Sequence, residues 1–409
     1  MMALVAVLLA CGRESQDTSS SQAETRRDSA GIEIVTNDAS AWREGSAWTL
    51  DTQPALTIAF DDRTNSGPTD VAGAVRLSNG NVVVASAQAL RLEVYDRAGR
   101  FLRTIGRRGD GPGEFRAITR IWRMRGDSLL LFEGGMTRRF VAFDSAGRAG
   151  RTWGAFGADS AMHFLVPVAP LSNGDVAMRT MTVITPATQV RYERPFTTLV
   201  LFDATWQLSR RLGQFPDVGR YRGPGRMLAE AFFTADTRFA FGATQWVAGD
   251  SEHAEYLEYT NDGRLARIVR WRPLAVPVRP EHIEREQERR VAYFRSLFSN
   301  VPRLQRQFID GGVRPLFVQM QYPLRFPEYS EIHVVGDGHV VLLDFPRIGE
   351  EETQQLALTV LSPVGRLLGR VVLPKRFRPL EIGSDYLLGV RTDDDDVPRV
   401  ELWHLYRAR

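Results

Sequence analysis

The sequence predicts an all-β fold built from a repeated pair of antiparallel strands. Apolar and polar residues alternate with a period of two over residues 91–95 and again over 101–105, and residues 96–99 form a turn between them. Successive side chains of a strand point to opposite faces of a sheet, and Asp and Gly favour tight turns. The same pattern recurs along the chain, and 409 residues with 43% hydrophobic content suffice for one extensive core.

Six such pairs can be counted. In each pair we assign the first strand to the inside of the fold and the second to a hairpin that leads outward. The first strands cover residues 81–86, 128–133, the segment after Asn173 and Gly174, 246–248, 339–345 and 386–390. The hairpins lie at residues 96–99, 143–147, 202–204, 261–263 and 362–365, and the sixth pair ends with residues 400–406.

The best copy of the repeat, VYDRAGRFLRTIGRRGDGPGEF at residues 94–115, resembles the NHL repeat. That repeat is a unit of about forty residues which forms one blade of a six-bladed β-propeller. The other copies keep the hydrophobic pattern and the turn but lack most of the glycine-rich segment. The resemblance implies a single six-bladed propeller over residues 31–409.

The sixth pair lacks an outer strand, because the chain ends first. Extended segments at Ile32, Ile34 and Val35 and at residues 47–50 belong to no blade. We therefore predict that the N-terminus donates the closing strand to the last blade, which removes exposed sheet edges. An open sandwich or two smaller propellers are the alternatives, and the regular spacing without a linker disfavours both.

Residues 272–329 interrupt the repeat between the fourth and fifth blades and predict helices. Pro280 suits a first helical turn, and an apolar stripe of Val291, Phe294, Phe298 and Val301 follows. A second short helix is expected between Pro302 and the glycines at 311 and 312. We expect the stripe to pack on the propeller, with contact to a partner or lipid as the alternative. The insertion is expected on one face, shaping access to the central channel.

The N-terminus predicts export and lipid anchoring. Residues 8–11, LLAC, look like a bacterial lipobox after a short apolar run, although no Lys or Arg precedes it. This predicts a signal peptide at 1–10, a diacylglyceryl group on Cys11, a disordered tether over 11–30 and a place in the bacterial cell envelope, on its periplasmic or extracellular side. An ordinary frayed terminus is the alternative. Cys11 is the only cysteine, so no disulfide is expected.

A candidate ligand site lies in the glycine-rich segment. Propellers keep function on the face made by loops between blades and by inner hairpins, where Arg107, Arg108, Asp110 and Arg116 are expected. Backbone N–H groups of this loop could cradle an anion beside the arginines. Alternatively the glycines serve only the turn, and Phe115 fills the core between blades.

A metal site is the competing hypothesis. Six-bladed propellers of the lactonase or gluconolactonase type resemble this architecture and bind a divalent cation at the channel mouth. By position the candidates are Asp70, Glu230 and His163, although Arg116 and Arg376 nearby would repel a cation. The acidic runs 393–396 and 350–352 are interpreted as solvated turns. The six histidines have no metal-ligand spacing, and no G-x-S-x-G motif occurs. We predict no cofactor, a divalent cation being the alternative.

The predicted function is a lipid-anchored, extracytoplasmic binding or scaffolding propeller with a protein, small-molecule or polymer ligand on the loop face. The alternatives are a metal-dependent hydrolase or lyase and, third, a spacer between envelope proteins. The net charge of +3 leaves no nucleic-acid footprint, and we expect a monomer held to the membrane by its N-terminal lipid.

Overall fold

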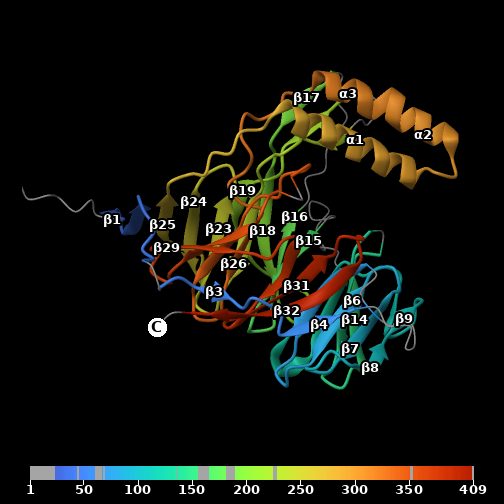
Figure 1. Cartoon of the computed structure of the whole chain (residues 1–409), viewed down its shortest axis with the longest axis horizontal. Helices are drawn as coiled ribbons and strands as arrows, with labels where there is room; N and C mark the ends of the chain where they lie inside the picture. The colour runs from blue at the N-terminus through green and yellow to red at the C-terminus, as the bar shows by residue number, and fades with distance from the viewer. Residues whose placement is uncertain are drawn as a thin grey trace, which may run out of the picture.

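Six antiparallel sheets form the blades of a propeller (Figure 1). The computed structural model describes residues 24–43, 46–59, 67, 70–135, 137–154, 165–180, 189–223, 228–350 and 353–407. The predicted signal peptide, Cys11 and His163 lie outside the described residues, as do Glu351 and Glu352. The tether predicted for residues 11–30 is wrong at its end, because β1 (Glu24–Ser29) pairs with β2 (Ile32–Asn37).

Each blade has four strands, named here in order from the axis outward. Blade one holds β5 (Val71–Arg76), β6 (Val82–Ser86), β7 (Arg91–Tyr95) and β8 (Phe101–Ile105). Blade two holds β11 (Arg120–Arg123), β12 (Leu129–Glu133), β13 (Arg139–Phe143) and β14 (Ala149–Gly154), with a 3-10 turn, η1 (Arg125–Asp127), after β11. Blade three holds β15 (Leu165–Pro170), β16 (Val176–Thr180), β18 (Phe196–Phe202) and β19 (Leu208–Pro216).

The second half of the ring repeats this order. Blade four holds β22 (Thr237–Phe241), β23 (Gln245–Asp250), β24 (Glu255–Thr260) and β25 (Leu265–Trp271). Blade five holds β26 (Glu331–Val334), β27 (Val340–Leu343), β28 (Ala357–Leu361) and β29 (Leu367–Val372). Blade six holds β30 (Phe377–Ile382), β31 (Tyr386–Thr392) and β32 (Pro398–Tyr406), completed by N-terminal strands.

The six-bladed fold is confirmed, but the predicted inner strands are the second strands of the blades. A further strand precedes each of them and faces the axis: β5, β11, β15, β22, β26 and β30. Several of these strands carry charged residues, as in RIWR of β11 and EIHV of β26. The axial strands border the central channel of the propeller, so they lack the continuous apolar run of the strands behind them.

The N-terminal chain closes the ring at blade six, as predicted. The strands β3 (Thr49–Leu50) and β4 (Leu56–Ile58) both pair antiparallel with β32. The segment at Ile32, in contrast, does not join the last blade. It forms β2, which runs parallel to β25 on the outer edge of blade four, because Val35 is fully buried there among apolar side chains.

Every pair of neighbouring blades shares a buried apolar cluster, which explains why the ring needs no disulfide. Phe115 fills the interface of blades one and two, Trp246 that of blades three and four, and Ile58 that of blades six and one. Similar clusters join blades two and three, four and five, and five and six. Burial at about 25 cal/mol per Å² of apolar surface therefore acts all around the ring.

The insertion between blades four and five is helical, as predicted, and projects beyond the blades (Figure 1). It comprises α1 (Pro280–Leu297), α2 (Pro302–Phe308), the π-helical turn η4 (Ile309–Val313) and α3 (Arg314–Gln319). The second short helix predicted between Pro302 and the two glycines is α2, which ends at Phe308, and Gly311 and Gly312 lie in the π-helical turn η4 that joins α2 to α3. Among the described residues no helix has the length and apolar character needed to cross a membrane.

The predicted apolar stripe packs only in part. Val291 is buried together with Leu316 of α3 and with Tyr221 and Phe232 of the chain between blades three and four. That part of the chain contributes β20 (Arg220–Arg222) and β21 (Leu228–Glu230) to a small sheet, which β17 (Arg191–Glu193) joins from the loop between the second and third strands of blade three. Phe294 and Phe298 are half-buried, and Val301 is 44% exposed. The stripe therefore packs on its own hairpin and the small sheet, rather than on the blades.

Candidate functional site: an arginine cluster at the propeller axis

One face of the ring carries all the long insertions of the chain. We call it the loop face and define it by the links from the fourth strand of each blade to the first strand of the next, together with the loops between second and third strands. The antiparallel order places residues 106–119, the helical insertion, the small sheet and residues 393–397 on this face. The first strand of every blade begins here, so residues at its start lie near the axis at this face.

Charged side chains from five blades converge at that position. Arg120 opens β11, Arg238 and Arg378 are the second residues of β22 and β30, and Glu331 opens β26. Arg179 lies near the end of β16, which runs back to the same face. We define the axial cluster as these five residues with His333: Arg120, Arg179, Arg238, Glu331, His333 and Arg378.

Electrostatic interactions connect members of the cluster that come from different blades. The charge of Glu331 in blade five acts on Arg120 in blade two, which stands on the opposite side of the ring. Desolvation lowers the pKa of Arg120, and the neighbouring charges of Arg179 and Arg238 act in the same direction. This guanidinium is therefore held among like charges.

Glu331 remains an anion within this surrounding. Desolvation opposes its ionisation, but a hydrogen bond with His333 at 2.9 Å and the charges of His333, Arg238 and Arg378 outweigh it and lower its pKa. The carboxylate thus belongs to the cluster as a counter-ion that its neighbours share.

The arginines of the cluster outnumber their carboxylate partners. Arg179 pairs with Asp236 at 2.9 Å and Asp217 at 3.8 Å, and Arg238 reaches Asp236 at 3.4 Å. Arg120 and Arg378, both exposed to solvent, have no ion pair with any described residue. Guanidinium groups bind carboxylate, phosphate or sulfate in a bidentate manner, so two such groups are available at the axis for an anion.

The glycine-rich loop brings its four predicted residues together but neutralises most of their charge. Arg107 pairs with Glu114 at 2.8 Å, and Arg116 pairs with Asp110. The N–H of Gly111 donates to Glu114, so this loop carboxylate occupies the predicted cradle. Arg108 is exposed. Arg107 and Arg108 form the short strand β9, which pairs with β10 (Glu114–Phe115).

The glycines of this loop have a structural reason. Phe115 is completely buried between blades one and two. Gly106 has a φ of +74°, and a Cβ at this position would overlap the ring of Phe115. The alternative interpretation of the loop as a turn around a core aromatic residue therefore describes its geometry. Its ligand role stays a prediction.

Asp70 and Glu230 both lie on the loop face, but no hydrogen bond or ion pair joins these two described residues. Glu230 has an electrostatic interaction with Arg179, and its backbone carbonyl accepts a hydrogen bond from Arg290 at 2.6 Å. Of the described residues only Asp250, Glu252 and His253 are close enough together to share a metal ion. Arg194 already pairs with Asp250 and Glu252 at 2.6 and 2.7 Å, which supplies the positive charge that a metal would bring.

The predicted acidic turns are held by arginines. Asp393 accepts the backbone N–H groups of Asp395 and Val397 and pairs with Arg399, while Arg376 pairs with Asp396. These contacts make the run a self-contained turn.

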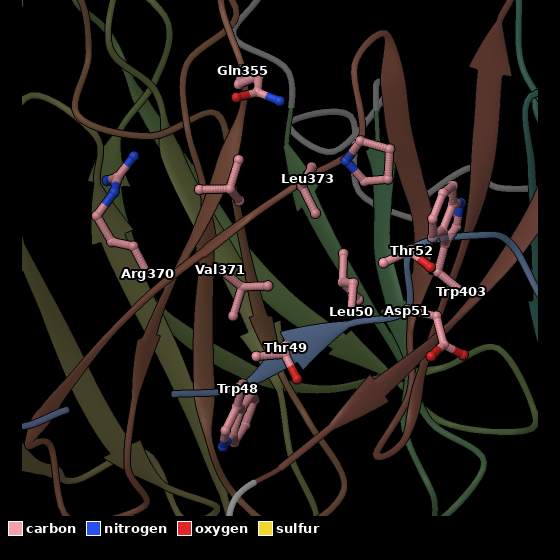
Figure 2. A pocket seen from close by; sticks show the side chains of 12 residues that line it. Trp48, Thr49, Leu50, Asp51, Thr52, Gln355, Arg370, Val371, Leu373 and Trp403 are labelled. Atoms are coloured by element: carbon pink, nitrogen blue, oxygen red, sulfur yellow. The ribbon is translucent and has the colours of Figure 1, made fainter. Parts of the chain in front are cut away.

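One cavity lies at the rim of the ring rather than at the axis. It measures about 420 Å³ and separates the outer strand β29 of blade five from β3 of blade six (Figure 2). Its tryptophans, Trp48 and Trp403, are buried. A second cavity of about 190 Å³ shares Gln355 and Arg370 with it, and Arg370 is bonded to Asp344 at 2.6 Å. Because the charged group shared by both cavities, Arg370, already has a carboxylate partner, the axial cluster is the better candidate for a ligand-binding site.

The axial cluster was not anticipated from the sequence. Its members are separated by more than two hundred residues along the chain, from Arg120 to Arg378. The available signal was a charged residue at the first or second position of a short strand that precedes each predicted pair, as in blades two, four, five and six.

Comparisons with known proteins agree with this architecture. A family model described as a 6-bladed beta-propeller (DUF5128) matches residues 64–146. No curated protein sequence matches the chain.

A solved member of the DUF4221 family from Bacteroides vulgatus has 10% sequence identity and a TM-score of 0.53, covering 89% of this chain and 100% of that one. A Bacteroides fragilis protein named as exported has 10% identity and a TM-score of 0.49, covering 92% and 100%. Streptogramin B lyase has 9% identity and a TM-score of 0.38, covering 87% of each chain. At such identities the likeness concerns the fold, and the chain is a six-bladed β-propeller.

Proposed function

We propose that the protein is a lipid-anchored, extracytoplasmic binding propeller whose loop face receives the anionic group of a small-molecule, polymer or protein ligand at the axial cluster. The observation that carries the proposal is the convergence of four arginines at the axis, two of which, Arg120 and Arg378, are exposed, form no salt bridge with a described residue and share only the charge of Glu331. A ligand carboxylate, sulfate or phosphate would supply the missing negative charge and take up bidentate hydrogen bonds.

The chemistry of the cluster favours binding over catalysis by a metal ion. Arg238 and Arg378 hold Glu331 ionised and would repel a divalent cation brought to the same place. The insertion and the small sheet lie on the same face and limit the directions from which a ligand can approach (Figure 1). A cluster of arginines bordered by loops on one face of the propeller is suited to binding an anion.

The binding site is tested by thermal unfolding of the chain carrying Cys11→Ser, with inorganic phosphate, sulfate or citrate added at matched ionic strength. We expect Tm to rise with at least one anion. We expect Arg120→Gln and Arg378→Gln each to weaken the binding of that anion by about tenfold or more, because hydrogen bonds to charged groups are worth about 1.5–3 kcal/mol.

The matched control is Arg108→Gln, which removes one exposed arginine from the glycine-rich loop. Sulfate and phosphate also stabilise proteins by exclusion from their surface, and that effect is the same in all three variants. An anion response that survives Arg120→Gln and Arg378→Gln but disappears in Arg108→Gln would move the site to the loop and refute the axial assignment.

Lipid anchoring is supported by the LLAC sequence at residues 8–11 and is tested separately. Cells grown with an alkyne-labelled fatty acid should label the wild-type protein and leave the Cys11→Ser variant unlabelled. The variant should also leave the membrane fraction, because stable anchoring requires two or more acyl chains. Equal labelling of both proteins would show that Cys11 carries no lipid.

A further inference from the structure

The end of the helical insertion exposes several large apolar side chains. Tyr293, Leu297, Val301 and Phe308 are exposed by 59, 56, 44 and 44%. The rings of Phe298 and Phe308 stack with their centroids 4.8 Å apart, and Phe298 also stacks on Phe294 at 6.4 Å. We call this surface, formed by Tyr293, Phe294, Leu297, Phe298, Val301 and Phe308, the aromatic tip.

The side chains of the aromatic tip are not needed to complete the buried core of the insertion. The hairpin has its own buried cluster, which includes Val291, Ile309, Val313 and Leu316, and this cluster packs on the small sheet. The tip lies at the end of α1 and the start of α2, at the free end of the helical hairpin, remote from the small sheet strand β17 (Figure 1). The protein therefore presents these aromatic groups to something outside itself.

Unpaired positive charge surrounds the tip. Residues 290–319 contain five arginines and one aspartate. Arg290 pairs with Glu286 and Arg314 with Asp310. The other three, Arg295, Arg303 and Arg306, are exposed, and none has an ion pair with a described residue.

We propose that the aromatic tip docks on an anionic lipid surface. Aromatic and leucine side chains insert at the boundary between headgroups and acyl chains, while arginines lie along the apolar surface and bind lipid phosphates. The tip lies at the end of a projecting hairpin, so its side chains can enter a deformable surface such as a lipid bilayer. The positive charge of the arginines around the tip is opposite to the charge of acidic phospholipids. Docking would hold the loop face at a defined orientation to the bilayer. It involves none of the axial residues, so it stands independently of the anion site.

The experiment places a fluorophore on the tip of the whole chain. The only native cysteine is removed by Cys11→Ser, and Leu297→Cys is labelled with an environment-sensitive NBD group. The matched control is Leu102→Cys, 50% exposed on β8, which lies at the opposite end of the view from α2 (Figure 1). Vesicles of phosphatidylcholine with phosphatidylglycerol are compared with vesicles of phosphatidylcholine alone.

We expect a blue shift and an increase in emission at position 297 with the anionic vesicles only, and no change at position 102. The variant with Arg295→Gln, Arg303→Gln and Arg306→Gln should bind on the order of 100-fold more weakly, from about fivefold for each charge. An equal response at both positions would indicate adsorption through the N-terminal leader and overturn the proposal. A silent label at position 297 at saturating anionic lipid would also overturn it and leave the tip to a protein partner.

Discussion

Replacing Ile58 by Asp is expected to destabilise the propeller by more than about 4 kcal/mol, because it introduces a charge into the interface that closes the ring. Ile58 is 1% exposed and pairs with Val400 in β32. It lies in the apolar cluster between blades six and one. Without β4 the edge of β32 also becomes available for pairing with another chain, so we expect oligomers as well as lower stability.

The neighbouring residue provides the control. Thr57 lies in the same strand with its side chain exposed and opposite Glu401, so the uncharged Thr57→Asn should change the free energy of unfolding by less than about 0.5 kcal/mol. Urea unfolding followed by circular dichroism measures both variants, and size-exclusion chromatography detects oligomers. If Ile58→Asp unfolds at the same urea concentration as Thr57→Asn, the N-terminal strand does not close the ring.

Glu133→Ala is expected to cost about 3–5 kcal/mol, the usual effect of removing one partner of a buried ion pair. Glu133 is completely buried, accepts two hydrogen bonds from Arg139 at 2.7 and 3.1 Å, and accepts another from the backbone N–H of Arg116 at 3.2 Å. Its removal leaves the Arg139 guanidinium, 19% exposed, without an ion pair and with one remaining hydrogen bond, which Nη2 donates to the backbone carbonyl of Glu114 at 3.0 Å.

Two comparisons separate this effect from simple loss of a contact. Arg148→Ala breaks an ion pair with Asp144 at which the arginine is 82% exposed, and it should cost less than about 1 kcal/mol. Replacing both buried partners, Glu133→Leu with Arg139→Met, should recover most of the stability, because no uncompensated charge remains. A Glu133→Ala protein as stable as Arg148→Ala would contradict the assignment. Similar buried pairs occur in other blades: Glu93 with Arg91, Glu258 with Arg267, and Glu401 with Arg391.

The second strand of each blade could be predicted from the sequence because of its place in the sheet. The second strand of a blade is covered by sheets on both faces, so it reads as an apolar run such as VVVAS in β6 or VVLL in β27. The first strands were missed because one face borders the channel, which interrupts the apolar pattern with Arg120, Glu331 and Arg378. Closure of blade six was predictable from a missing partner, whereas the pairing of β2 with blade four was not, since Val35 is compatible with any open edge.

For the site, local sequence was informative only where the contacts are local. The turn geometry of residues 106–119 could be inferred because Gly106, Glu114 and Phe115 contact one another within a few residues. That Arg107 and Arg116 find carboxylate partners in the same loop needed coordinates. Lipidation of Cys11 stays a prediction from the LLAC sequence.

The sequence by itself determined the repeated blade, the number of blades and the helical character of the insertion, because these follow from periodicity and turn residues within short stretches of chain. Only the tertiary structure decided where charge remains unpaired. Arg120 and Arg378 each interact with the charge of Glu331 from a different blade, which is possible only when the ring is closed. Arg295, Arg303 and Arg306 lie on a hairpin that projects from the blades, away from the carboxylates of the blades. Electrostatic interaction depends on distance in space, and separation along the chain does not specify that distance.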